Sequence, residues 1–88
     1  MFSEEFVIKN RLGLHARAAV VLVQTAGRYG SDITISKDDI EVNGKSIMGI
    51  LMLGATMGTT IRITAKGSDA ERAVAELGRL ISSKFGEE

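Results

Sequence analysis

The 88-residue sequence contains no cysteine, no proline and no tryptophan. Without cysteine the chain cannot form a disulfide scaffold, a thiolate zinc site, an iron–sulfur cluster or a cysteine nucleophile. A fold without cross-links is compatible with a reducing compartment, so we expect a cytoplasmic protein. Its longest apolar runs fall far short of the roughly 20 residues that a membrane span needs. The acidic start over residues 1–5 lacks the apolar segment of a signal peptide.

The chain also lacks net charge, because 11 basic residues balance 11 acidic ones. No global field therefore attracts nucleic acid or an anionic membrane. Aromatic residues make up 5% of the sequence, which leaves few rings for stacking on bases. We expect neither a nucleic-acid partner nor a membrane partner. The 44% of hydrophobic residues suffice for one two-layer core, which predicts a single domain over residues 1–88 that acts as a monomer.

Local patterns predict the element order β-α-β-β-α-β-α. Alternating apolar and polar residues predict strands at residues 2–8, 32–37, 40–42 and 60–66. Helical periodicity predicts helices at 16–26, at 47–53 behind an N-cap at Ser46, and from residue 70 behind a capping box at 68–71. Gly86 is the expected stop of the last helix. This order predicts an α+β fold in which helices cover one face of a mixed or antiparallel sheet.

Inward-facing side chains are predicted for three of these elements from their apolar spacing. They are Phe2, Phe6 and Ile8 in the first strand, Ala19, Val20, Val23 and Ala26 in the first helix, and Ala70, Ala73, Val74, Leu77, Leu80 and Ile81 in the last helix.

The only histidine, His15, lies at the expected start of the first helix. The free N–H groups of a first helical turn bind anions, and the helix dipole there disfavours a protonated imidazole. A nucleophilic ring nitrogen is thereby left free. Arg17 adds a planar set of donors that suits a phosphoryl group. All charges between residues 6 and 31 are basic. The pattern favours reversible capture of phosphate on a ring nitrogen.

Other interpretations of His15 stay open at this point. The simplest is a surface histidine beside a helix cap. A metal site is disfavoured because the sequence offers no second histidine and no cysteine, so we expect no metal and no cofactor. A hydrolase triad lacks a carboxylate near His15 in sequence, although one can approach in space.

Residues 10–19, with the sequence NRLGLHARAA, resemble the active-site segment of the HPr family, the histidine-containing phosphocarriers of the bacterial sugar phosphotransferase system. Residues 44–50, GKSIMGI, resemble the regulatory-serine segment of that family. Residues 58–61 and 67–71 resemble its last strand and the entry to its last helix. The resemblance covers the whole chain. It implies an open-faced β-sandwich with a four-stranded antiparallel sheet in the order 1-4-2-3 and three helices on one face.

The resemblance also implies a chemistry for His15. The family accepts a phosphoryl group from enzyme I, itself charged by phosphoenolpyruvate, and passes it to A-type domains of enzyme II in sugar uptake and its regulation. In the family the acceptor is the δ1 ring nitrogen. Arg17 would stabilise the phosphoryl group, and the backbone of Ala16 and Arg17 would bind it. Such a protein is a carrier and a substrate of enzyme I, not an enzyme.

One position departs from the family pattern, because proline usually stands where this chain has Ala18. Proline suits a first helical turn, since its missing N–H costs nothing there. Alanine keeps the helix but leaves that turn less rigid.

Ser46 and the short helix behind it form the second candidate region. The resemblance adds phosphorylation by a serine kinase, reversed by a phosphorylase, to the role of Ser46 as an N-cap. The helix at 47–53 is apolar on nearly all sides, so some of its side chains must be exposed. Adaptable methionines suit a surface that meets several partners. By resemblance, this surface would flank His15 and dock on enzyme I and enzyme II through Ile47, Met48, Leu51 and Met52.

Two competing functions belong to other classes. A regulatory partner-binding module of the same fold would act through Ser46 and the apolar helix, but relatives of that kind lack the histidine. A nucleic-acid-binding α+β domain would need a basic face that this sequence does not provide. Within the carrier class, a nitrogen-related regulatory branch stays open beside sugar uptake.

Overall fold

The computed structural model describes residues 1–87, and it has the predicted order of elements. They are β1 (Phe2–Val7), α1 (Ala16–Ala26), β2 (Asp32–Lys37), β3 (Ile40–Asn43), α2 (Ile47–Leu53), β4 (Thr60–Lys66) and α3 (Ala70–Ser82), followed by the 3₁₀ turn η1 (Lys84–Gly86). The predicted bounds of α1, β2, α2 and β4 are confirmed. Within residues 1–87, none of the helices has the length and apolar character needed to cross a membrane.

The four strands form one antiparallel sheet in the order β1-β4-β2-β3, as the resemblance implied. Apolar and polar residues alternate along the strands, so the two faces of the sheet differ in polarity. The isoleucines of β2 and β4 are buried on one face, whereas the other face is polar. On the polar face Arg62 forms an ion pair with Glu5 at 2.8 Å. This is the pattern of an antiparallel sheet that is covered on one side only.

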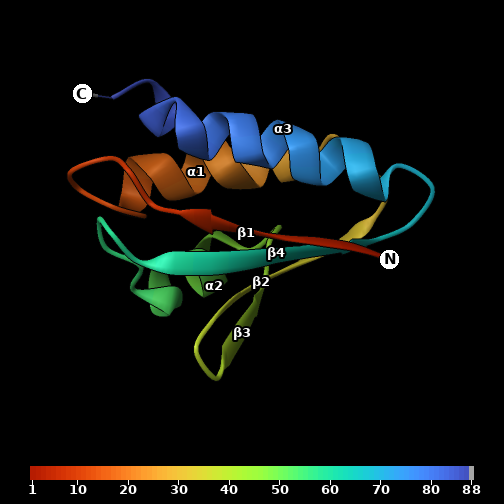
Figure 1. Cartoon of the computed structure of the whole chain (residues 1–88), viewed down its shortest axis with the longest axis horizontal. Helices are drawn as coiled ribbons and strands as arrows, with labels where there is room; N and C mark the ends of the chain where they lie inside the picture. The colour runs from red at the N-terminus through yellow and green to blue at the C-terminus, as the bar shows by residue number, and fades with distance from the viewer. Residues whose placement is uncertain (88) are drawn as a thin grey trace.

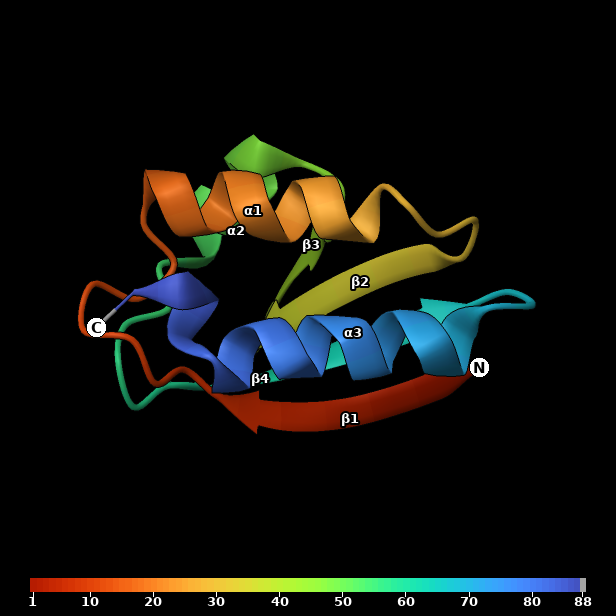
Figure 2. The same ribbon diagram turned by 90° about the horizontal axis from the view of Figure 1, so that it is seen from above.

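Helices α1 and α3 lie side by side over the apolar face of the sheet (Figures 1 and 2). Helix α2 packs on α1 and against β2 and β3. The predicted inward face of α1 was partly wrong. Because α1 contacts both α2 and α3, its buried face is rotated towards Ala18 and Leu22, while Val20 is only half-buried. Ala19 and Ala26 are buried as predicted, and Val23 packs at the margin of the core.

The inward faces of β1 and α3 are largely confirmed. Ile8 is buried, and Phe2 and Phe6 pack against the core. In α3 the predicted stripe is buried except for Leu80, which is half-buried. Gly78 joins this face because the Phe6 ring lies where a side chain at residue 78 would be.

The predicted capping box at the start of α3 was wrong. The N-cap is Asp69, and its side chain makes no capping hydrogen bond. Its carboxylate instead accepts hydrogen bonds from the Ser31 hydroxyl and from the backbone N–H groups of Gly30 (2.9 Å) and Ser31 (3.1 Å). Three donors on the α1–β2 loop thus outcompete the helix end for this carboxylate. The Ser31 hydroxyl and the Gly30 amide lower the pKa of Asp69 below its usual value.

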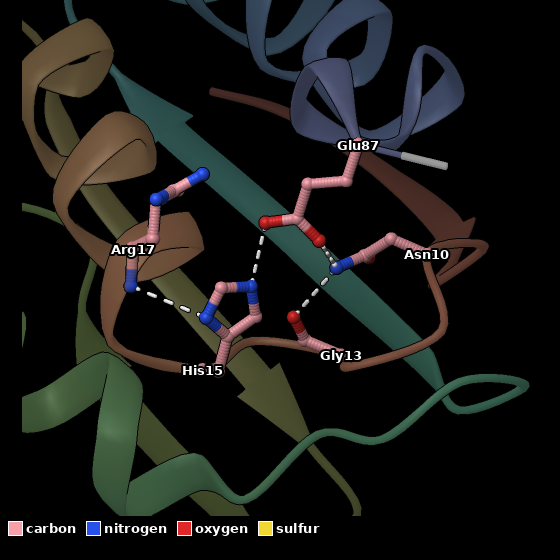
Figure 3. A network of polar contacts seen from close by, with 5 residues as sticks. All are labelled: Asn10, Gly13, His15, Arg17 and Glu87. Atoms are coloured by element: carbon pink, nitrogen blue, oxygen red, sulfur yellow. Dashed lines mark hydrogen bonds and ion pairs between the residues drawn. The ribbon is translucent and has the colours of Figure 1, made fainter.

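The predicted end of α3 at Gly86 was also wrong, since the helix ends at Ser82. Lys84, Phe85 and Gly86 adopt left-handed backbone conformations with φ of 60°, 55° and 77°. For a residue other than glycine this conformation costs about 1–2 kcal/mol. Phe85 is only 8% exposed, and its burial contributes about 1.5–3 kcal/mol, which offsets part of the backbone cost. The turn directs Glu87 back towards the loop that precedes α1 (Figure 3).

Candidate functional site

His15 is the N-cap of α1, where the sequence placed it. Its backbone is extended, with φ −76° and ψ −178°, and its Nδ1 accepts a hydrogen bond from the N–H of Arg17 at 3.3 Å. The imidazole thereby takes the place that a serine or aspartate side chain usually fills at a helix start. Nδ1 faces the positive end of the helix dipole.

The loop before His15 is fixed against the connection between α2 and β4. Leu14 is buried, and its N–H donates to the carbonyl of Ala55 at 2.9 Å. Gly13 has φ +65°, and a Cβ there would lie 2.5 Å from the Ala55 oxygen and 2.9 Å from the Cα of Thr56. Only glycine combines this conformation with so close an approach. The position of the imidazole is therefore set by backbone contacts before His15, where Gly13 and Leu14 meet Ala55, and after it, where the Arg17 N–H bonds the ring.

A carboxylate that the sequence analysis did not identify completes the site. Glu87 Oε2 lies 2.6 Å from His15 Nε2, and Glu87 Oε1 accepts a hydrogen bond from Asn10 Nδ2 at 3.0 Å (Figure 3). The same Asn10 nitrogen donates to the Gly13 carbonyl at 2.7 Å. The sequence allows a carboxylate to approach His15 in space, but no local pattern indicates Glu87 or Asn10.

These contacts assign the tautomer of the neutral ring. Nδ1 accepts the Arg17 N–H and therefore carries no proton. The single ring proton then lies on Nε2, which donates to Glu87. Hydrogen bonds from Asn10 and then His15 lower the pKa of Glu87, so its carboxylate is ionised at neutral pH. The network leaves Nδ1 without a proton at the helix start, where its lone pair accepts only the long 3.3 Å hydrogen bond from Arg17.

Basic side chains and one free backbone amide line the hollow in which His15 lies. Arg11, Leu12, His15, Ala16, Arg17 and Glu87 line one open hollow. Within the described part of the chain, neither arginine side chain forms an ion pair. The N–H of Ala16, which also lines the hollow, has no hydrogen-bond partner among residues 1–87. Such an arrangement suits a dianionic group at Nδ1. No cluster of residues 1–87 is suited to hold a metal ion.

Ser46 caps α2, as predicted, because its Oγ accepts a hydrogen bond from the N–H of Gly49 at 3.1 Å. Helix α2 buries only Ile50 and Leu53. The predicted exposure of its other large side chains is confirmed. Two further exposed apolar residues, Leu12 and Met57, lie on the loops at either side of the Gly13–Ala55 contact, and no helical or strand pattern in the sequence indicated them. We call this set the apolar surface: Leu12, Ile47, Met48, Leu51, Met52 and Met57.

The fold and the site together define a small open-faced α+β sandwich that presents one imidazole at a helix start. Residues 2–83 match the family model described as the PTS HPr component phosphorylation site. The chain is 43% identical to phosphocarrier protein HPr of Xylella fastidiosa (strain 9a5c) over 88 residues, covering 100% of this chain and 99% of that protein. It is 45% identical to phosphocarrier protein HPr of Neisseria meningitidis (strain Z2491) over 87 residues, or 99% of this chain and 98% of that one.

The structure is similar to the crystal structure of HPr-C-His from Thermoanaerobacter tengcongensis, with a TM-score of 0.97 and 49% sequence identity. The match covers 100% of this chain and 99% of that one. The chain belongs to the HPr family, the phosphocarriers of the phosphotransferase system.

Proposed function

We propose that this chain carries a phosphoryl group on Nδ1 of His15, accepts it from enzyme I and passes it to A-type domains of enzyme II. The observation that carries the proposal is the unprotonated Nδ1 at the start of α1, in one hollow with Arg17 and the free N–H of Ala16. We propose with it that the chain acts in the cytoplasm as a monomeric single domain. A regulatory module without transfer would have no use for such a nitrogen.

In the proposed step the Nδ1 lone pair forms a bond to phosphorus. The bond between phosphorus and the donor atom breaks, and its electron pair leaves with the donor. The N–H of Arg17, which bonds Nδ1 at a long 3.3 Å, turns to a phosphoryl oxygen instead. The N–H of Ala16 and the Arg17 guanidinium supply further donors and positive charge. Onward transfer reverses these changes.

The test is incubation with phosphoenolpyruvate and enzyme I, followed by intact mass before and after acid treatment. We expect a gain of one phosphoryl group that acid removes, because phosphoramidates hydrolyse in acid, and no gain in His15→Ala. An acid-stable gain that persists in His15→Ala would overturn the proposal.

The role of Arg17 is tested by the rate of the same reaction. Arg17→Ala loses a charge-assisted contact, so we expect transfer from enzyme I to slow by about tenfold or more. Arg28→Ala is the matched control, because Arg28 is exposed but lies outside the hollow. Equal rates for the two variants would remove Arg17 from the site.

We further propose that enzyme I and enzyme II dock on Ile47, Met48, Leu51 and Met52, and that a serine kinase regulates this step at Ser46. Support comes from the exposure of these side chains on a helix that follows Ser46 directly. A phosphate on Ser46 adds about −1.5 to −2 charges beside the surface at pH 7. An enzyme that delivers phosphate presents a negative group there, so the added charge opposes docking.

Ser46→Asp tests this regulation, since an aspartate still caps a helix. We expect slower transfer from enzyme I at a nearly unchanged melting temperature. Ser3→Asp places the same charge on the polar face of the sheet and should transfer normally. If Ser46→Asp transfers as fast as Ser3→Asp, Ser46 serves only as a cap.

A further inference from the structure

The proposed transfer uses Nδ1 of His15 and assigns no task to the opposite nitrogen. Nε2 nevertheless has a partner of its own, the Glu87 carboxylate at 2.6 Å. The second oxygen of that carboxylate is held by Asn10, which is fully buried and also bonded to the Gly13 carbonyl. Imidazole, carboxylate and amide thus form one connected network.

The backbone that presents Glu87 is also fixed. Phe85 is buried two residues earlier, and the left-handed turn at Lys84–Gly86 directs the following residue to His15. The Glu87 side chain is only 16% exposed at this contact. A surface glutamate held by water alone would need neither the buried anchor nor a buried amide donor.

We propose, on the basis of the proposed function, that Glu87 is a positioning residue: its carboxylate keeps the ring proton on Nε2 while Nδ1 gains and loses the phosphoryl group. The Nδ1 lone pair forms the bond to phosphorus, and the ring keeps its Nε2 proton and becomes cationic. The adjacent Glu87 carboxylate balances that charge. In onward transfer an acceptor atom of the enzyme II A-type domain forms a bond to phosphorus as the N–P bond breaks. The electron pair of that bond returns to Nδ1, and the ring is again the neutral Nε2–H tautomer.

This arrangement determines the leaving group of the onward step. With the proton retained, neutral imidazole leaves phosphorus. Without the carboxylate, the cationic phosphorylated ring has no counter-charge and gives up its Nε2 proton more readily. A ring that has lost this proton would depart as an imidazolide anion, which is a poorer leaving group. The other charged groups that line the hollow are Arg11 and Arg17, both cationic, so neither can hold the ring proton. Among residues 1–87, Glu87 is the acid paired with the ring.

Glu87→Gln is the sharpest variant, because glutamine has one acceptor oxygen where two are in use. That oxygen can serve either Asn10 or His15, and a glutamine NH₂ facing Nε2 would move the ring proton to Nδ1. Glu76→Gln is the matched control, since Glu76 is a partly exposed residue of α3 whose one ion pair among residues 1–87 is with Arg79. The measurements are ¹⁵N shifts of the His15 ring before and after phosphorylation, and single-turnover transfer to an enzyme II A-type domain.

In the wild type and in Glu76→Gln we expect a protonated Nε2 in both states. In Glu87→Gln we expect Nε2 to be less protonated in the phosphorylated state than in the wild type at the same pH. We expect onward transfer to slow by about tenfold, the worth of one charge-assisted hydrogen bond. A purely structural role would lower the melting temperature without changing the shifts, and that result overturns the inference.

The two proposals fail in different ways. If the wild type accepts no phosphoryl group on His15, the proposed function is wrong. If the wild type accepts it, and Glu87→Gln keeps the Nε2 proton and transfers at the wild-type rate, only the inference about Glu87 is wrong.

Discussion

Replacing Gly13 with alanine tests how the loop before α1 fixes His15. The backbone at residue 13 is left-handed, with φ +65°, and an alanine Cβ would lie 2.5 Å from the Ala55 carbonyl oxygen and 2.9 Å from the Cα of Thr56. Both obstacles are backbone atoms, so no side-chain rotation relieves the overlap. The loop must move away from Ala55, and the Leu14 N–H to Ala55 hydrogen bond of 2.9 Å is stretched or broken.

Two contributions give the size of the effect. An alanine in a left-handed conformation costs about 1–2 kcal/mol. The lost backbone hydrogen bond adds about 0.5–1.5 kcal/mol. Their sum, about 1.5–3.5 kcal/mol, lowers the melting temperature by roughly 6–28 °C, because 1 kcal/mol shifts a domain of this size by about 4–8 °C. Movement of the loop also displaces the imidazole from Glu87, so phosphoryl transfer should slow.

The assay is thermal unfolding followed by circular dichroism, with Gly30→Ala as the matched control. Gly30 has no atom within 4 Å of an added Cβ and no positive φ, so alanine there should be neutral or stabilise by about 0.4–1 kcal/mol. If Gly13→Ala melts within a few degrees of the wild type, the steric reasoning is refuted. An equal drop in Gly30→Ala would point to a general effect of losing glycine.

Three further predictions concern stability. Asp69→Asn should be less stable than the wild type at pH 7. Folding lowers the pKa of Asp69, so the ionised carboxylate stabilises the fold at every pH above the pKa of the unfolded chain. Urea titrations should therefore show that the difference in stability between the two proteins shrinks below about pH 4. Ala18→Pro should raise the melting temperature by a few degrees, because the Ala18 N–H has no partner among residues 1–87; a lower value would show that the ring does not fit this buried position. Ile50→Ala should lower the free energy of unfolding by about 2–5 kcal/mol in denaturant titrations, because Ile50 is buried. Met48→Ala should change it by no more than about 0.5 kcal/mol, because Met48 is exposed. Comparable losses in the two variants would show that both faces of α2 pack in the core.

Most elements of the fold were predictable from the sequence, because their patterns report burial on one side. Residues 60–66 alternate isoleucine and alanine with polar side chains, and the structure buries the apolar set on the helical side of β4. Ser46 was predictable for a similar reason: a helix start needs an acceptor, and a hydroxyl supplies one. His15 was found by composition and position, since it is the only histidine and precedes a clear helix.

Features that depend on distant partners were not predictable in this way. The His15–Glu87 contact joins residues 72 positions apart. It requires left-handed backbone at Lys84 and Phe85, which local preferences disfavour and which the burial of Phe85 helps to stabilise. Asp69 was misinterpreted for the same reason. Its neighbours in sequence fit a capping box, but the loop at residues 30–31 lies close enough in space to bind the carboxylate first.

The two ends of the chain are not equivalent as points of attachment. Met1 is 85% exposed, and the amino end lies at the opposite end of the long axis from the β1–α1 loop (Figures 1 and 2). A dye, a linker or a neighbouring polypeptide joined before Met1 therefore projects away from His15. The other end of the described chain reaches the imidazole itself through Glu87. For surface immobilisation or pull-down experiments, an anchor at the amino end leaves His15 facing the solution, whereas one at the carboxyl end would crowd the hollow in which His15 lies.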